Sequence, residues 1–188
     1  HQLGLRADQP LTLFLGRLNF KKGLDLLIPA FGKVLHALPD ACLAIVGPDN
    51  EGLGAKVRQW CVDSGLEQQV IFVDHIPPEE CRQAYVDADV FALTSYTENT
   101  GMTVVEAMAC GCPVVISGQV NIWPLIDEAG AGLVVPLDID QISDALLRLL
   151  RNAEYAAKMG AAGRAVAKDQ FSWETIVDAL DQVYEALV

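Results

Sequence analysis

The sequence predicts an α/β fold, a doubly wound parallel sheet with helices on both faces and a helical C-terminal tail. Short apolar runs rich in Val, Ile, Leu and Phe recur without polar alternation, as in strands that are buried on both faces. Segments with helical spacing lie between consecutive runs. After Pro136 only helical patterns continue, so the sheet is expected to end there.

Six apolar runs are the expected strands. They lie at residues 11–15, 42–46, 70–73, 90–93, 113–116 and 133–135. Between the first two runs, Leu24, Leu27, Ile28, Phe31 and Val34 form one helical stripe. Further helices are expected at residues 54–63, 79–87, 102–110, 142–150, 153–166 and 173–187. Ser172 is the expected N-cap of the last helix.

Length and composition favour one domain. With 188 residues, of which 52% are hydrophobic, the chain can close one core of ordinary size. Residues 11–188 are expected to form this unit, with residues 1–10 as the remnant of an interdomain linker. The apolar runs are far shorter than a bilayer span, and no basic-then-apolar leader opens the sequence, so a cytoplasmic location is expected.

The charge balance argues against nucleic-acid binding. Thirteen basic and 25 acidic side chains give a formal net charge of −12, and the acidic residues are scattered along the chain. A phosphate backbone is bound by the opposite electrostatic field. We therefore expect no nucleic-acid partner.

The cysteines show no sign of a disulfide framework or a metal site. Their number is odd, and neither Cys-x-x-Cys spacing nor a nearby histidine is present around Cys42, Cys61, Cys81, Cys110 and Cys112. They are interpreted as reduced, small core residues rather than catalytic or metal-binding ones.

A basic segment follows the first expected strand. Residues 16–23 read Gly-Arg-Leu-Asn-Phe-Lys-Lys-Gly and enter a helix, where open N–H groups favour an anion. Arg17, Lys21 and Lys22 lie within six residues in an otherwise acidic chain. A phosphate held at this edge of the sheet explains them best. Solvated surface charge is the alternative.

A second polar segment runs from Glu98 to Glu106 and continues as Ala-Met-Ala-Cys-Gly-Cys-Pro. Glu98 is expected in a loop at the carboxyl end of a strand, where capping of the next helix is its alternative role. Glu106 falls on the stripe of Met102, Val105 and Ala109, and we expect it to be a carboxylate in a mostly buried helix. A ribose diol would satisfy it. Gly101 would let the backbone approach a ligand, although a simple turn glycine is possible.

In these motifs the chain resembles the retaining glycosyltransferases of the GT-B fold, in the group called family 4 or group 1. The resemblance rests on two glutamates separated by seven residues, Glu98 and Glu106, on Gly16-Arg17-Leu18 with Lys22-Gly23, and on the run from Glu106 to Pro113 and two valines. It covers nearly the whole chain. It implies a Rossmann-like C-terminal donor domain, one half of a GT-B fold, whose N-terminal acceptor domain is absent from this chain.

The resemblance also implies site residues. Glu98, Arg17 and Lys22 would be catalytic, with both cations on the donor diphosphate and Glu98 near the transferred sugar. Glu106 would bind the ribose hydroxyls. The other donor-binding positions are Gly16, Val73, Asp74, His75, Ile76, Asn99, Thr100, Gly101 and Met102, of which residues 73–76 would face the nucleobase. His75 is interpreted as a loop residue beside the base rather than a catalytic base.

The expected function is transfer of a hexose, with retention, from a nucleoside diphosphate sugar such as UDP- or GDP-hexose to an acceptor. The isolated domain is expected to be inactive, and the missing domain could bring peripheral membrane association. No cofactor is expected. Clustered acidic metal ligands are lacking near the motifs, and Arg17 and Lys22 can stabilise the departing diphosphate, so donor binding is expected to be independent of metal.

Two other classes of function were weighed. A nicotinamide-dependent oxidoreductase requires a Gly-x-Gly-x-x-Gly turn after the first strand, and residues 16–19 read Gly-Arg-Leu-Asn instead. A non-catalytic nucleotide-binding module, or another GT-B enzyme such as a phosphorylase or epimerase, remains the alternative. The presence of Arg17, Lys22 and Glu106 favours the transferase.

Overall fold

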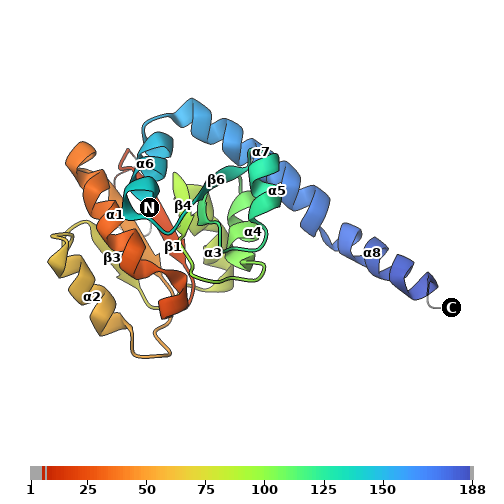
Figure 1. The fold of residues 1–188 in the computed structure, drawn as a ribbon, viewed down its shortest axis with the longest axis horizontal. Helices are drawn as coiled ribbons and strands as arrows, with labels where there is room; N and C mark the ends of the chain where they lie inside the picture. Colours follow the sequence, from red (N-terminus) through yellow and green to blue (C-terminus); the bar gives the residue numbers. More distant parts are fainter. Residues whose placement is uncertain (1–5, 7, 187–188) are drawn as a thin grey trace.

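A parallel sheet forms the centre of the molecule (Figure 1). The structure, a computed structural model, describes residue 6 and residues 8–186. Within this part of the chain the sheet has six strands in the order β3-β2-β1-β4-β5-β6, all of them parallel. They are β1 (Leu11–Leu15), β2 (Cys42–Val46), β3 (Val70–Val73), β4 (Val90–Leu93), β5 (Val114–Ser117) and β6 (Gly132–Val135). The predicted α/β class and the six predicted strands are confirmed.

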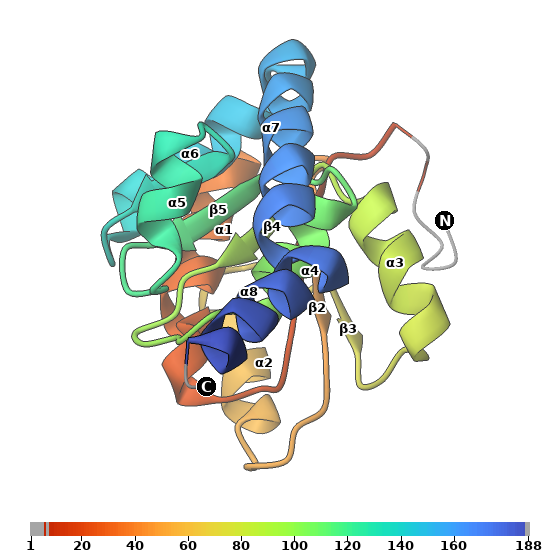
Figure 2. The same ribbon diagram turned by 90° about the vertical axis from the view of Figure 1, so that its right-hand side faces the viewer.

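Helices cover both faces of the sheet, as expected (Figure 2). One layer contains α1, which packs against α2 and α6, and the other contains α4, which packs against α3 and α7. The helices are α1 (Leu24–Ala37), α2 (Gly54–Asp63), α3 (Pro78–Asp87), α4 (Met102–Ala109), α5 (Trp123–Glu128), α6 (Ile139–Leu150), α7 (Ala153–Phe171) and α8 (Trp173–Glu185), and a 3-10 turn, η1 (Phe20–Lys22), precedes α1.

The structure corrects several of the predicted boundaries. The short α5 was not predicted, because six residues are too few to show a helical period. Helix α6 begins earlier than expected, since Asp138 caps it by accepting a hydrogen bond from the Gln141 N–H at 3.0 Å. Helix α7 continues through a polar stretch that the hydrophobic pattern could not assign. Ser172 caps α8 as predicted, and the expected end at residue 187 lies outside the described residues.

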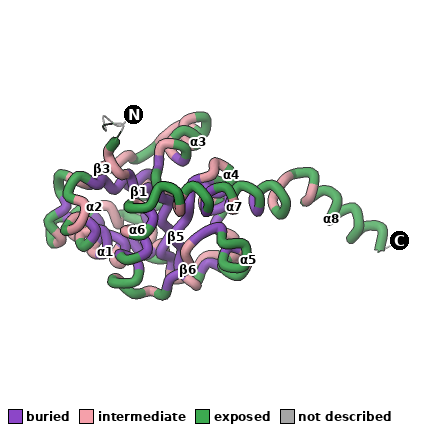
Figure 3. Tube along the Cα trace, turned by 90° about the horizontal axis from the view of Figure 1, so that it is seen from above, coloured by how far each residue is buried: buried purple, intermediate pink, exposed green. Residues whose placement is uncertain are grey.

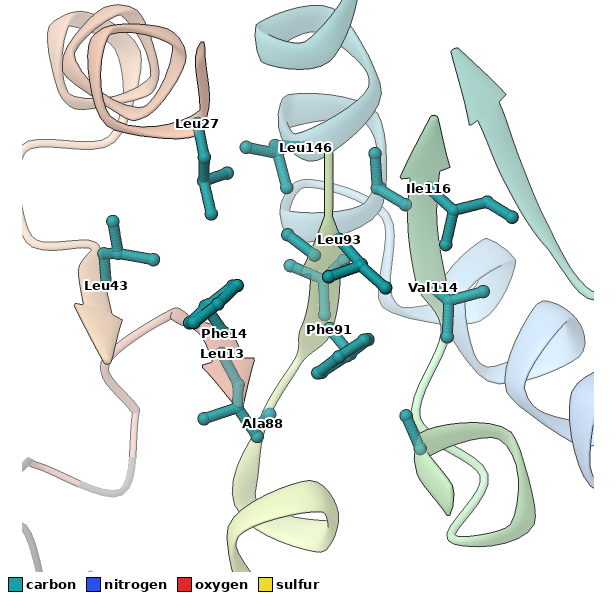
Figure 4. Close-up of a cluster of buried hydrophobic side chains, with 14 of the residues drawn as sticks. Leu13, Phe14, Leu27, Leu43, Ala88, Phe91, Leu93, Val114, Ile116 and Leu146 are labelled. Atoms are coloured by element: carbon teal, nitrogen blue, oxygen red, sulfur yellow. The ribbon is translucent and has the colours of Figure 1, made fainter. Parts of the chain in front are cut away.

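The core lies on both faces of the central strands (Figure 3). Every residue of β2, β4 and β5 is buried, which explains why these runs lack polar alternation. On one face, Leu27 of α1 and Leu146 of α6 join side chains from the strands in one apolar cluster (Figure 4). The sheet is therefore a rigid base for the loops at its carboxyl edge.

Glycines allow α7 to lie very close to α4. A Cβ atom on Gly160 would overlap the carbonyl oxygen of Gly111, which follows α4. The Arg164 guanidinium then donates from Nη2 to the Cys110 carbonyl oxygen at 2.8 Å. This contact holds α4, and the loop that precedes it, against the body of the domain.

Replacing Gly160 with alanine is expected to lower the free energy of unfolding by about 1–3 kcal/mol, because α7 must move away from Gly111. Gly32→Ala, in α1, is the matched control. Its new methyl group would meet neighbours only at 3.7–3.8 Å, so higher helix propensity should raise stability by about 0.5–1 kcal/mol. Urea unfolding measures both changes. A stabilising Gly160→Ala would contradict the close packing.

The five cysteines are free, as expected, but only three of them are core residues. Cys42, Cys61 and Cys112 are buried, whereas Cys81 and Cys110 are half-buried at the surface between α3 and α4. Burial raises the pKa of Cys42 to about 11, that of Cys61 to about 11 and that of Cys112 to about 12, from an ordinary value of 9.0. These thiols stay protonated in the folded chain well above neutral pH.

The raised thiol pKa values predict a loss of stability in alkali. Above pH 9 the unfolded chain releases thiol protons that the folded chain retains, so stability is complete below that pH and falls as pH rises toward the folded values. Each thiol contributes up to about 1.4 kcal/mol per pH unit. Urea unfolding at pH 8 and pH 10.5, under reducing conditions, should show a shallower loss for Cys112→Ala than for the wild type. Equal losses would refute this account.

Helix α8 leaves the body of the domain and contacts it through α7 (Figure 1). None of its described residues is buried. Its predicted apolar stripe is present and faces solvent, with Trp173 80% exposed and Tyr184 66% exposed. Val177, Leu180 and Val183 lie on the same stripe and are also exposed.

Candidate functional site

Two loops meet at the carboxyl edge of the sheet. The strand order reverses between β1 and β4, and ligands of open α/β sheets bind in the crevice beside such a reversal. Residues 16–23 follow β1, and residues 94–101 follow β4. Both polar segments singled out in the sequence therefore lie at this point.

Direct contacts lock the two loops together. Gly23 has a φ of 69°, and a Cβ atom there would overlap the carbonyl oxygen of Thr94. The Thr94 hydroxyl donates to the Gly23 carbonyl oxygen at 2.8 Å, and the Tyr96 N–H donates to the Lys21 carbonyl oxygen at 2.7 Å. The loops thus form one unit.

Tyr96 reinforces this unit and was missed by the sequence reasoning. Its ring stacks on Phe20 with centroids 5.3 Å apart, and its hydroxyl donates to Asp25 Oδ2 at 2.8 Å. Burial, followed by the hydrogen bond to Asp25, raises the pKa of Tyr96, so the phenol remains a donor. The available signal was position, because Tyr96 and Asp25 flank the predicted site residues Glu98 and Lys22.

A polar cavity of about 420 Å³ opens above the joined loops. It is lined by Arg17, Asn19, Lys21, Lys22, Glu51, Thr97, Glu98 and Asn99. The structure thus brings together Arg17, Lys22, Glu98 and Asn99, which the sequence analysis had placed in one site. Glu51, from the loop after β2, was not foreseen, since no motif marked it.

The two expected cationic arms differ in the structure. The Lys22 ammonium group forms an ion pair with Glu98 Oε2, and both side chains are 21% exposed. Arg17 is exposed, and among the described residues its guanidinium has no recorded partner. Arg17 is therefore free to bind an anion, whereas Lys22 is already engaged.

Backbone donors complete this edge of the site. Gly101 is the N-cap residue of α4 and has a φ of 65°, in the left-handed region that favours glycine. No acceptor within the described chain is recorded for the N–H groups of Thr100, Gly101 and Met102. Together with the helix dipole, these N–H groups offer an anion site at the start of α4.

Glu106 departs from the prediction. It is exposed rather than buried, because the sheet and α7 cover the face with Val104 and Met108. Of the predicted stripe only Val105 is buried, and Met102, Glu106 and Ala109 are exposed. A hydroxyl donor that was not foreseen is present within the chain, since the buried Tyr85 hydroxyl donates to Glu106 Oε2 at 2.7 Å. Burial, followed by this hydrogen bond, raises the pKa of Tyr85.

Glu106 belongs to a separate cavity from Glu98. A hollow of about 330 Å³ between α3 and α4 is lined by Pro78, Cys81, Arg82, Tyr85, Glu106, Ala109 and Cys110. Pro78 begins α3 only two residues after Ile76, the last of the predicted base-contacting positions. The Glu106 cavity therefore lies beside the loop that follows β3.

The predicted base-contacting residues line two further hollows. Val73, Asp74 and His75 line a cavity of about 700 Å³, and Val73, His75 and Ile76 line one of about 240 Å³. His75 is an exposed loop residue, as predicted. Arg58, which was not foreseen, lies over the Phe72 ring at 4.1 Å and lines the larger cavity. Gly16 lines none of these hollows; its N–H donates to the Val46 carbonyl oxygen at 2.9 Å.

The described residues contain neither a cluster of metal-ligand side chains nor a membrane-spanning helix. No group of three or more His, Cys, Asp or Glu side chains is placed to hold a metal ion. No described helix combines the length and apolar character needed to cross a membrane.

The fold and the site define an α/β domain with a polar cavity, lined by basic and acidic side chains, at the strand-order reversal. Gly160 and Gly163 lie inside α7 and pack it against α4, so they do not form a glycine-rich nucleotide-binding turn. Comparison with known proteins identifies the family. The chain belongs to the glycosyl transferases group 1, whose model matches residues 1–166.

Curated relatives share this domain. A GDP-mannose-dependent alpha-(1-6)-phosphatidylinositol monomannoside mannosyltransferase of Mycolicibacterium smegmatis is 36% identical over 179 residues, which are 90% of this chain and 46% of that protein. A D-inositol 3-phosphate glycosyltransferase of Mycobacteroides abscessus is 33% identical over 191 residues, 97% of this chain and 41% of that protein. The chain spans about half the length of these relatives.

Solved structures agree with the fold. A sucrose-phosphate synthase from Thermosynechococcus elongatus matches 99% of this chain and 47% of its own, with a TM-score of 0.88 and 32% identity. HepE of Anabaena, in complex with UDP and glucose, matches 99% and 50%, with a TM-score of 0.85 and 25% identity. The C-terminal domain of the group 1 protein LpcC of Francisella tularensis matches 87% of both chains, with a TM-score of 0.78 and 25% identity.

Proposed function

We propose that this chain is the donor-binding domain of a retaining hexosyltransferase that uses a UDP- or GDP-hexose. The observation that carries the proposal is the polar cavity at the ends of β1 and β4, where Arg17, Lys22, Glu98 and Asn99 converge beside the start of α4. Cations around this cavity, with the open N–H groups at the start of α4 next along the chain, suit a diphosphate. Their task is to stabilise the negative charge that builds on the departing diphosphate.

Glu106 suits the ribose. Tyr85 occupies one carboxylate oxygen, Oε2, and holds the side chain in place from the buried side. The remaining acceptor capacity faces the open cavity between α3 and α4, where two ribose hydroxyls could donate to it. The base would then lie beside residues 73–76, which lead directly into that cavity at Pro78.

The acceptor half of the enzyme is proposed to lie outside this chain. The relatives are about twice as long, and the LpcC match is to a domain named C-terminal in its own protein. The exposed apolar stripe of α8 is an available contact surface for such a second domain. Acceptor choice, and any peripheral contact with a membrane, would reside there. The relatives named for GDP-mannose and the HepE complex with UDP support both nucleotides as candidates.

Calorimetric titration of the chain with UDP, GDP, ADP and their sugar conjugates, with EDTA present, tests the proposal. We expect saturable binding of one nucleotide without metal, weakened about tenfold or more by Arg17→Ala and by Glu106→Ala, since each removes a charged hydrogen-bond partner. Arg151→Ala, an exposed cation that donates to Ala37, and Glu154→Ala are matched controls and should bind as the wild type does. Absence of binding by every nucleotide, or equal weakening by the controls, would overturn the proposal.

A further inference from the structure

The Lys22–Glu98 ion pair joins two groups to which the proposed function gives different partners. Lys22 would bind the donor diphosphate, and Glu98 would lie near the sugar, yet the structure bonds the two side chains to each other. We propose that Glu98 competes with the diphosphate for Lys22 and so discriminates a sugar-bearing donor from the sugar-free nucleoside diphosphate product. This inference rests on the proposed function.

The backbone around the pair is fixed, so the pair can open only by side-chain rotation. The Lys22 N–H donates to the Asn19 carbonyl oxygen at 3.0 Å, and the next residue, Gly23, is in close contact with Thr94. Glu98 donates its N–H to the Gln119 carbonyl oxygen at 3.1 Å and accepts from the Asn121 N–H at 3.0 Å. The long lysine side chain is therefore the part that swings.

Partial burial strengthens the ion pair with which a diphosphate must compete. Lys22 and Glu98 are each only 21% exposed, whereas Lys33 and Asp140, which also pair, are 48% and 71% exposed. Partial burial lowers the effective dielectric and the screening by salt, so the Lys22–Glu98 attraction is stronger than that of a surface pair. A diphosphate must displace the Glu98 carboxylate before it gains the full charge of Lys22.

A bound hexose offsets the cost of separating Lys22 from Glu98. When Lys22 turns to the diphosphate, the Glu98 carboxylate loses its cation and needs new donors, because an unpaired, largely buried carboxylate is costly. Hexose hydroxyls can supply those donors, and a sugar-free diphosphate cannot. Glu98 thus weakens binding of the product while the donor compensates for the loss of the ion pair. Product release is favoured in consequence.

Glu51 provides a matched control within the same cavity. Its carboxylate has the same charge and lines the cavity with Glu98, but it accepts a hydrogen bond from the uncharged Asn19 amide at 2.5 Å rather than from a cation. Glu51→Gln and Glu98→Gln therefore remove equal charge, and only Glu98→Gln releases Lys22.

Titration with inorganic pyrophosphate, GDP and UDP, followed by GDP-mannose and UDP-glucose, tests the inference. Glu98→Gln should tighten pyrophosphate and the bound nucleoside diphosphate about fivefold, and Glu51→Gln by no more than about twofold through its general field. The preference for the sugar nucleotide over the matching diphosphate should fall in Glu98→Gln. Urea unfolding of each variant confirms that the fold is intact.

A double-mutant cycle separates a specific pair from a general charge effect. In a Lys22→Met background, Glu98→Gln should change pyrophosphate affinity by no more than about twofold, as Glu51→Gln does through its general field. The inference is overturned if Glu98→Gln does not tighten diphosphate binding, if Glu51→Gln tightens it equally, or if the full gain of about fivefold persists without Lys22.

The same titrations distinguish a failure of this inference from a failure of the proposed function. If pyrophosphate follows the expected pattern and no nucleotide binds better than pyrophosphate, the donor-domain proposal and the discrimination of donor from product both fail, and only the ion-pair competition stands. If a nucleotide binds the wild type as proposed and Glu98→Gln brings no gain, the inference alone fails.

Discussion

The close approach of Gly23 to the Thr94 carbonyl oxygen is the constraint on which the site depends. It brings the loop after β1 against the loop after β4, and the Thr94 and Tyr96 hydrogen bonds then fix their register. Every charged group of the polar cavity except Glu51 comes from one of these two loops. The electrostatics of the cavity therefore follow from a backbone contact that only glycine permits.

A second backbone contact holds the opposite side of the site. Gly160 packs directly on Gly111, because neither residue has a side chain that intervenes, and this contact sets the position of α4. The position of α4 in turn places the open N–H groups before Thr103 and the carboxylate of Glu106. Tyr85, from α3, then fixes that carboxylate from the buried side. Helix α4 thus connects the polar cavity at the ends of β1 and β4 with the hollow beside α3, and one element sets the spacing of both.

The sequence alone was sufficient for the strands and for the meeting of the two polar segments at one edge of the sheet. Runs such as Cys42–Val46 are buried on both faces, so their composition identifies them directly, and the chain topology brings their carboxyl ends to one edge. The sequence could not predict that Glu106 is exposed, because periodicity shows which residues share a stripe but not whether a neighbouring element covers that stripe. The pairing of Lys22 with Glu98 joins side chains 76 positions apart and depends on rotamers, which no local pattern encodes. Helix α5 was too short to leave a periodic signal.

Helix α8 contributes no buried residue and leaves the body from the end of α7. The folding equilibrium of the α/β body and the surface chemistry of the whole chain are consequently set by different segments. Substitutions along the outer stripe of α8 can alter how the protein behaves in solution, its self-association and its retention on apolar media, while the cooperative unfolding of the sheet stays the same. The domain is in this sense modular, with a packed α/β body and an appended helix that evolution or engineering can change independently.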